Sequence, residues 1–134
     1  MDVNYASELD LDFISGHDHH IAKEELLKLI LDKKVLIAIK DYKICGWLRY
    51  SLFWNNIPFM NMLYFLESER GKGQGRKLVE FWENEMKSKG YKKLMTSTLS
   101  DENAQHFYRK LNYIDSGCLL LPGETLEILF VKQI

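Results

Sequence analysis

The sequence predicts a mixed α/β layer fold, in which helices flank a β-sheet. Two helical patterns open the chain, and three strand patterns follow them. A helix, a strand, a second helix and a final pair of strands complete the order. The strand–helix–strand unit around a glycine-rich loop should place its two strands parallel, because such crossovers are right-handed and return the chain in the same direction. With 134 residues and no repeat or linker, the chain is expected to form a single domain, residues 1–134.

The beginning of the chain carries two helical patterns. Residues 6–15 have Leu9 and Phe13 one turn apart, which predicts a weak helix. Residues 21–32 have apolar side chains at helical spacing and predict a stronger helix, with Asp18 as its N-terminal cap.

Three strands are predicted next, separated by two turns. Residues 35–39 are nearly all apolar, as in a strand that is buried on both faces. A turn at residues 41–43 leads into the second strand, where Gly46 indicates a bulge or close packing. The turn in "WNNIP" favours positive φ at its two asparagines, and Pro58 suits the start of the third strand, residues 59–66.

The glycine-rich loop is followed by an amphipathic helix, residues 74–89. Leu78, Trp82 and Met86 repeat at the spacing of one helical face, and Gly90 is placed to end the helix. The remaining predicted elements are a strand at 91–99, a short helix at 101–111 ended by Asn112, and two strands at 118–122 and 126–134.

Composition limits the function. Hydrophobic residues make up 46% of the chain and charged residues 28%, as in ordinary soluble proteins, and the formal net charge is −1. This balance argues against a general binder of nucleic acids or of membrane surfaces. No apolar run approaches the ~20 residues of a membrane span, and no signal peptide is visible. Cys45 and Cys118 lie in apolar stretches outside any C-x-x-C pair, so we expect two reduced core residues of a cytoplasmic protein.

The most informative segment is "ESERGKGQGRKLVEFW", residues 67–82, in which Gly71, Gly73 and Gly75 lie among basic residues just before a helix. Glycines let the backbone bend tightly and leave its N–H groups accessible, and a helix start adds unpaired N–H groups with partial positive charge. These features predict a socket for a phosphate or diphosphate; the alternative is a glycine-rich turn with a solvated basic face. Counted from Gly71, both the nucleotide P-loop and the dinucleotide fingerprint fail, because Arg76 stands where each requires a glycine.

The remaining pattern is R-x-x-G-x-G, at Arg70, Gly73 and Gly75. It resembles motif A of the GNAT N-acetyltransferase superfamily, Q/R-x-x-G-x-G/A, which cradles the pyrophosphate of acetyl-coenzyme A. A second segment, "NAQHFYRKLNY" at residues 103–113, is similar to the family's A-x-x-F/L-Y-x-K-x-G-F/Y segment. The helix and strand between the two also fit. The resemblance covers residues 59–134 by its motifs and the earlier half by element order.

The resemblance implies a mostly antiparallel sheet whose central parallel strands splay apart, and direct attack of a primary amine on acetyl-coenzyme A as co-substrate. The pantetheine arm would bond to the third strand, and a strand amide near Leu66 would stabilise the developing oxyanion. Tyr108 would act as the general acid toward the departing thiolate. The family often has an asparagine where this chain has Asp101, and Asn103 would take over that contact. The cofactor-binding residues implied are Tyr64, Phe65, Leu66, Arg70, Gly71, Lys72, Gly73, Gln74, Gly75, Arg76 and Asn103.

The general base and the acceptor stay open. Some relatives carry a glutamate where this chain has Thr96, which cannot act as a base but could hold a water. The other base candidates are Glu124, Glu127 and a histidine of "HDHH", and no base is needed if the amine arrives partly neutral. His19, Trp54 and Thr96 are candidate acceptor-site residues, with loop capping and packing as the alternatives for the first two.

Three functions are compatible with these residues. The leading one is an N-acetyltransferase for a small-molecule or peptide amine, without a metal, nucleic acid or membrane as partner. The second is a non-catalytic acyl-coenzyme A sensor or interaction module on the same fold. The third, a nucleic-acid binder that uses residues 70–77, lacks a broad basic face. The histidines of "HDHH" are too close in sequence to bind one zinc ion easily. Edge strands of the C-terminal hairpin could pair in a homodimer.

Overall fold

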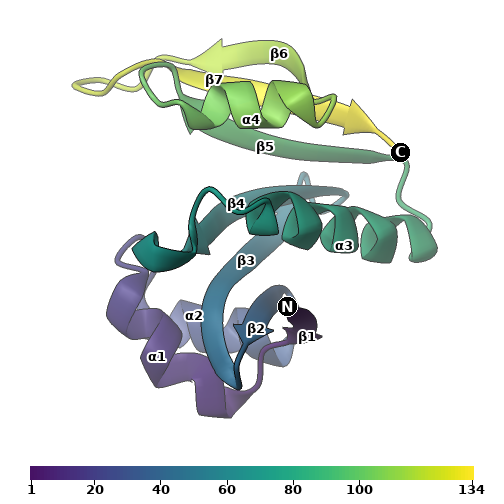
Figure 1. Ribbon diagram of the computed structural model, residues 1–134. Helices are drawn as coiled ribbons and strands as arrows, with labels where there is room; N and C mark the ends of the chain where they lie inside the picture. Colours follow the sequence, from purple (N-terminus) through teal and green to yellow (C-terminus); the bar gives the residue numbers. More distant parts are fainter. The chain divides into compact units, whose positions relative to one another are not determined.

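The computed structural model describes all 134 residues and contains four α-helices, two short 3₁₀ helices and seven strands (Figure 1). The elements are β1 (Asp2–Tyr5), η1 (Glu8–Asp10), α1 (Leu11–His17), α2 (Lys23–Leu31), β2 (Val35–Lys40), β3 (Lys43–Phe53), β4 (Ile57–Phe65), η2 (Glu67–Glu69), α3 (Gln74–Ser88), β5 (Lys93–Leu99), α4 (Ala104–Lys110), β6 (Ile114–Leu119) and β7 (Glu127–Gln133). The strands form one mostly antiparallel sheet in the order β1-β2-β3-β4-β5-β7-β6. The predicted mixed α/β fold is therefore confirmed. None of the helices is both long and apolar enough to cross a membrane.

The sheet contains one parallel pair, β4 with β5. Phe59 pairs with Met95, and Met60 pairs with Thr96. This arrangement confirms the parallel crossover that the strand–helix–strand unit predicted. The splaying of the two strands stays a prediction.

The chain divides into two compact units. The N-terminal unit comprises Met1–Ser51 and Met62–Trp82, and the C-terminal unit comprises Leu52–Asn61 and Glu83–Ile134. The single domain expected from the sequence stays a prediction.

In the N-terminal unit, α1 and α2 pack against one face of the β2–β3 hairpin (Figure 1). Val35 and Ile37 alternate along β2 and so point to the same face, and Trp47 lies opposite Ile37 on β3. These side chains are buried together with Ile14 of α1 and Leu26 of α2. The apolar side of the predicted second helix, now α2, thus faces the sheet.

β1 is a strand that the sequence did not predict. Its ends pair with β2, where Asp2 lies opposite Ile39 and Tyr5 lies opposite Leu36. So short a strand has no strong periodicity of its own and is stabilised by its partner. The weak helix predicted at residues 6–15 is in fact η1 followed by α1, and Leu9 is 94% exposed.

The predicted cap of α2 is wrong, because Asp18 has other partners. α2 begins at Lys23, and Ala22 occupies its capping position. Asp18 is buried and accepts hydrogen bonds from Arg49 Nε at 2.8 Å and from Trp47 Nε1 at 3.4 Å, both on β3. Burial alone would raise the pKa of Asp18, but the hydrogen bond and the charge of Arg49 lower it. This ion pair ties the connection between α1 and α2 to the sheet.

The structure has both a bulge and close packing at Gly46, the two alternatives that a glycine inside the second strand indicated. Ala38 pairs with Gly46 and Ile39 pairs with Ile44, so Cys45 is the extra residue of a bulge. A Cβ at Gly46 would lie 2.5 Å from the ring of Phe65, the last residue of β4. Only glycine therefore lets this buried ring pack so closely on β3.

We expect Gly46→Ala to lower the free energy of unfolding by about 2 kcal/mol, because overpacked cores typically lose ~1–3 kcal/mol. Urea unfolding of both proteins measures the difference. Gly16→Ala in α1 is the matched control, since a Cβ at Gly16 meets no atom within 4 Å. Equal unfolding midpoints for the wild type and Gly46→Ala would contradict the close packing.

In the C-terminal unit, β7 lies between β5 and β6, and α4 packs on one face of these strands (Figure 1). Tyr108 of α4 contacts Phe130 of β7, with ring centroids 6.0 Å apart, and Tyr113 at 5.7 Å. The Tyr113 hydroxyl donates to Glu83 Oε2 at 2.8 Å, and Lys132 Nζ lies 3.0 Å from the same oxygen. Three buried aromatic rings therefore form the centre of this unit.

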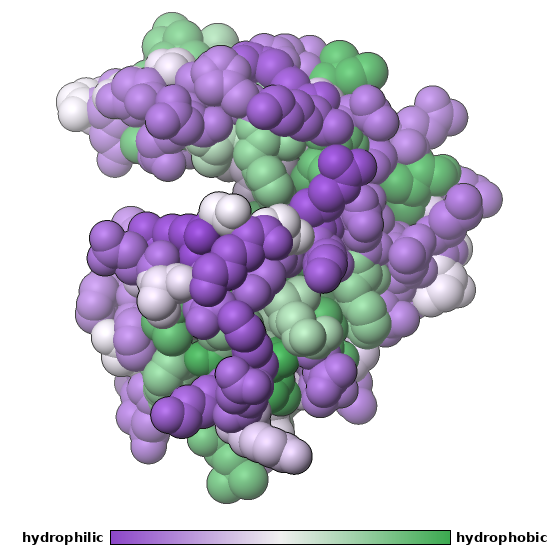
Figure 2. Space-filling view, in the orientation of Figure 1, coloured by the Kyte–Doolittle hydropathy of each residue, from purple (hydrophilic) through white to green (hydrophobic).

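The C-terminal hairpin differs from its prediction in extent and burial. β6 begins at Ile114 rather than at residue 118, and all of its residues are exposed. Cys118 is therefore exposed, which corrects its predicted core position, whereas Cys45 is buried as predicted. On the face drawn in Figure 2, apolar groups are separated by hydrophilic side chains. β6 is an edge strand and pairs only with β7. The expected homodimer stays a prediction.

α3 confirms the predicted amphipathic helix. Leu78, Trp82 and Met86 are buried at the expected spacing. After α3, Gly90 has φ 92° and Tyr91 N donates to Met86 O at 3.2 Å, the arrangement of a helix that ends at a left-handed residue. Asn112 ends α4 in the same way, with φ 70°.

Candidate functional site

The glycine loop joins η2 to α3 in the N-terminal unit. Gly71 has φ 75° and Gly73 has φ 78°, in a backbone region that residues other than glycine rarely adopt. A Cβ built on either residue meets no atom within 4 Å. The space over this part of the backbone is therefore open.

The backbone N–H groups of the loop have no partners within the protein. No N–H group of residues 71–76 donates to a backbone oxygen, and the first amide to do so is Lys77 N, which lies 3.3 Å from Gly73 O. Successive N–H groups around residues of positive φ form a concave anion-binding site, and the start of α3 adds partial positive charge. The loop is therefore suited to bind a diphosphate through its main chain.

The basic side chains of the loop are less available than the sequence suggested. Arg70 Nε donates to Phe65 O at 2.8 Å, and its guanidinium lies 5.0 Å from the ring centre of Tyr64. Lys72 Nζ lies 3.6 Å from Glu69, and Arg76 pairs with Glu80 at 2.8 Å. Arg70 thus stabilises the end of β4. The groups of the loop best placed to donate hydrogen bonds to an anion are its main-chain N–H groups.

The end of β4 carries the amides among which the resemblance places the oxyanion donor, near Leu66. Leu66 N donates to Cys45 O at 2.9 Å, and Leu66 O accepts from Glu69 N at 2.8 Å. Both polar groups of the Leu66 backbone are therefore engaged within the unit. Successive N–H groups of an extended chain point to opposite sides, so Phe65 N–H points away from β3. Phe65, rather than Leu66, has the amide that is directed outward.

Tyr108 lies in the C-terminal unit and is 6% exposed. Thr96 is near enough to lower the pKa of the Tyr108 hydroxyl, and its own Oγ1 donates to Met60 O at 2.9 Å. Burial raises the pKa of Tyr108 from its ordinary value of 10.0 to about 12. Tyr108 therefore holds a proton at neutral pH and can act as an acid but not as a base.

This raised pKa predicts a loss of stability in alkali. The folded state binds the Tyr108 proton more tightly than the unfolded state does, so the stabilisation is complete below about pH 10 and is lost as the pH rises toward about 12. Burial also raises the pKa of Tyr113, with the charge of Glu83 as a further cause, so the loss continues at higher pH. Urea midpoints at about pH 8 and about pH 11 test this expectation. A midpoint that stays constant over this range would contradict it.

The predicted acceptor residues belong to different units, with His19 in the N-terminal unit and Trp54 and Thr96 in the C-terminal unit. Thr96 is 1% exposed, and its hydroxyl donates to Met60 O at 2.9 Å; its place at the acceptor site stays a prediction. Trp54 is 79% exposed and packs on Phe53, with ring centroids 4.6 Å apart. His19 is also exposed. Asn103 is exposed and occupies the capping position of α4 without a side-chain hydrogen bond to the helix.

The base candidates differ in their surroundings. Glu127 has a buried Oε2 without a hydrogen-bond partner, and its pKa is raised by burial and by the charges of Glu102 and Glu124. A carboxylate in such surroundings is a better base than an ordinary one. In "HDHH", His17 Nδ1 donates to Phe13 O at 2.9 Å, so the lone pair of its neutral ring is on Nε2.

One residue of the loop was missed by the sequence reasoning. Glu69, directly before Arg70, contacts Lys40 and Gln74 as well as Lys72. An acidic residue inside a basic anion-binding segment is the signal that could have identified it. No group of three or more His, Cys, Asp or Glu side chains in the chain is arranged to hold a metal ion.

A mixed sheet with one parallel pair, and a loop of free N–H groups at a helix start, define an α/β protein whose glycine loop is suited to bind an anion. Residues 5–113 match the acetyltransferase (GNAT) family, and the chain belongs to this family. The resemblance carried by the glycine loop and by α4 is thus confirmed. No curated protein sequence matches the chain significantly.

Solved structures share the whole fold. An acetyltransferase of the GNAT family from Bacillus cereus is 24% identical, with a TM-score of 0.80, over 98% of this chain and 96% of its own. Ard1 from Thermoplasma volcanium is 12% identical, with a TM-score of 0.86, over 99% and 97% of the two chains. The PaiA N-acetyltransferase from Thermoplasma acidophilum, solved in complex with coenzyme A, is 17% identical, with a TM-score of 0.77, over 99% and 98%. At these identities the similarity establishes the common fold.

Proposed function

We propose that this protein transfers the acetyl group of acetyl-coenzyme A to a primary amine of a small molecule or peptide. The observation that carries the proposal is the row of unpaired N–H groups at residues 71–76, at the start of α3, in a chain of the GNAT acetyltransferase family. A similar fold binds coenzyme A in the PaiA protein of Thermoplasma acidophilum.

The loop fits the diphosphate of this co-substrate. Gly71 and Gly73 leave the space over the N–H groups open, and a side chain at either position would fill it. Two negative phosphates would receive several main-chain hydrogen bonds and the field of the α3 N-terminus. The outward amide of Phe65 is the main-chain donor for the acyl end, as the family resemblance assigns it to β4.

The resemblance assigns Tyr108 the role of proton donor to the departing thiolate. One property of this side chain within its own unit supports that role. Its pKa of about 12 keeps it protonated at neutral pH. When bound, acetyl-coenzyme A supplies the acetyl group and leaves as a thiol. The acceptor amine must lose one proton, which Glu127 or solvent would accept.

A thiol-release assay with a panel of amines tests the activity. Purified protein is mixed with acetyl-coenzyme A and, in separate reactions, with a peptide N-terminus, lysine, a polyamine and an aminoglycoside. We expect free thiol to accumulate with at least one amine, in equal amount to the acetylated product. Thiol release without an acetylated amine would indicate only hydrolysis.

The second candidate is a non-catalytic acyl-coenzyme A sensor. The burial of Tyr108 among aromatic rings favours this alternative, because a tyrosine packed in the core stabilises the fold whether or not it takes part in chemistry. A sensor would bind the co-substrate, as measured by calorimetry, and release no thiol with any amine of the panel.

A further inference from the structure

Glu69 is the centre of a polar network beneath the glycine loop. Its Oε2 accepts hydrogen bonds from Lys40 Nζ and from Gln74 Nε2, both at 3.2 Å, and lies 3.6 Å from Lys72 Nζ. The Glu69 side chain is 19% exposed. One carboxylate oxygen therefore connects η2, the loop, the start of α3 and the end of β2.

The network continues into the sheet through Gln74. Gln74 is buried, and its Oε1 lies 3.6 Å from the Cys45 thiol, which is also 3.4 Å from Ala38 O. Cys45 is the bulged residue of β3, and Ala38 lies on β2. The first residue of α3 is thus fixed on one side by Glu69 and on the other by the two strands below it.

A carboxylate beside a diphosphate site is electrostatically unfavourable. Lys40 and Lys72 compensate the charge of Glu69, since both contact it. If charge alone decided affinity, the loop would bind an anion better with a neutral residue at this position. The contacts of Glu69 therefore indicate a structural role that outweighs its charge.

We propose that Glu69 is a positioning residue that holds the glycine loop in its diphosphate-binding shape before the ligand arrives. The proposal rests on the proposed function, in which residues 71–76 bind the diphosphate of coenzyme A. If the loop has its binding shape for only a fraction of the time, the apparent affinity for the ligand is the intrinsic affinity multiplied by that fraction. The contacts of Lys40 and Gln74 with one carboxylate raise this fraction and so reduce the loss of affinity.

Whether Glu69→Ala raises or lowers the affinity for coenzyme A shows which effect of Glu69 is larger, its support of the loop or its negative charge. In Glu69→Ala the loop loses its support and gains net positive charge. We expect the dissociation constant of coenzyme A, measured by calorimetry, to rise about tenfold, because positioning outweighs charge. The KM for acetyl-coenzyme A should rise similarly, while kcat and the KM for the acceptor amine stay unchanged.

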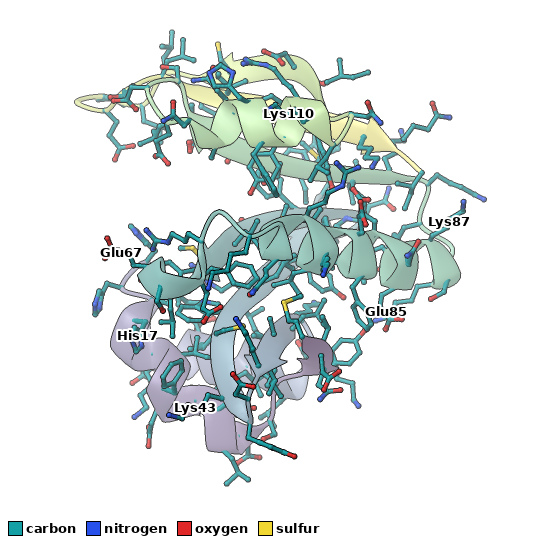
Figure 3. The ribbon with its side chains drawn as sticks, viewed as in Figure 1. His17, Lys43, Glu67, Glu85, Lys87 and Lys110 are labelled. Carbon is teal, nitrogen blue, oxygen red and sulfur yellow. The ribbon has the colours of Figure 1, made fainter.

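Glu67→Ala is the matched control. Glu67, labelled in Figure 3, is an exposed carboxylate on the same short helix as Glu69, and its side chain makes no hydrogen bond or ion pair. Its removal changes the charge near the loop by the same amount and leaves the network intact. Affinity for coenzyme A should stay within about twofold of the wild type or increase slightly.

Two further variants identify the contacts. Glu69→Gln keeps an oxygen that accepts from Lys40 and Gln74, and should recover most of the affinity lost in Glu69→Ala. Lys40→Met should weaken binding in the wild type and add nothing in the Glu69→Ala background. Thermal unfolding checks that every variant is folded.

Equal or tighter binding of coenzyme A by Glu69→Ala would overturn the positioning role. Additive effects of Lys40→Met and Glu69→Ala would also contradict it. If the wild type itself does not bind coenzyme A, the proposed function fails, and the role of Glu69 falls with it. Normal wild-type binding with an unaffected Glu69→Ala would refute the positioning role alone.

Discussion

Gly73→Val is expected to raise the dissociation constant of coenzyme A at least about 100-fold. Gly73 has φ 78°, where a residue with a side chain loses about 1–2 kcal/mol and a β-branched one loses more. The loop would shift away from this conformation and disperse the N–H groups of residues 71–76. A valine side chain that did enter the open space would block the ligand directly. Calorimetric titration with coenzyme A measures the effect.

Gly123→Val is the control for backbone strain. Gly123 has φ 76° and open space around its Cβ position, but it lies between β6 and β7 in the C-terminal unit. This variant should lose stability to a similar extent and bind coenzyme A normally. Wild-type affinity in Gly73→Val would refute the anion-binding role of the loop.

Tyr108→Phe is expected to lower kcat roughly 100- to 1,000-fold, the usual contribution of a general acid. The affinity for coenzyme A should change less than about threefold, because the loop that binds the diphosphate is untouched. The fold should tolerate the change, since Thr96 Oγ1 keeps its hydrogen bond to Met60 O and only the phenol oxygen is removed. Steady-state kinetics with the best amine of the panel gives both parameters.

Tyr113→Phe separates catalysis from packing. Tyr113 is also a buried tyrosine of the C-terminal unit, and its hydroxyl donates to Glu83. Its loss should lower stability, because Glu83 then keeps only Lys132 as a partner, but it should leave kcat near the wild-type value. Full activity in Tyr108→Phe, or an equal loss in Tyr113→Phe, would remove the catalytic role from Tyr108.

The parts of the fold that local chemistry determines were predictable from the sequence. The apolar spacing of α3 and the residues that end it, Gly90 for α3 and Asn112 for α4, are properties of single segments. The glycine loop was equally predictable, because positive φ at Gly71 and Gly73 is a local requirement of the bend. The bulge at Gly46 followed from a glycine inside a strand.

The remaining features depend on partners that are distant in the sequence. β1 exists because β2 offers it a free edge, and Asp18 prefers Arg49 on β3 to a helix end nearby. The Thr96 hydroxyl donates to Met60 O on the neighbouring parallel strand, which no spacing rule indicates. The engagement of the Leu66 amide by Cys45 likewise follows from strand pairing rather than from the loop itself.

A crystal structure of the protein with coenzyme A tests the central claim most directly. The account predicts that oxygens of the diphosphate lie within about 2.7–3.2 Å of several main-chain nitrogens of residues 71–76. Electron density for coenzyme A elsewhere on the protein, with these nitrogens in contact only with solvent or with a neighbouring side chain, would contradict it.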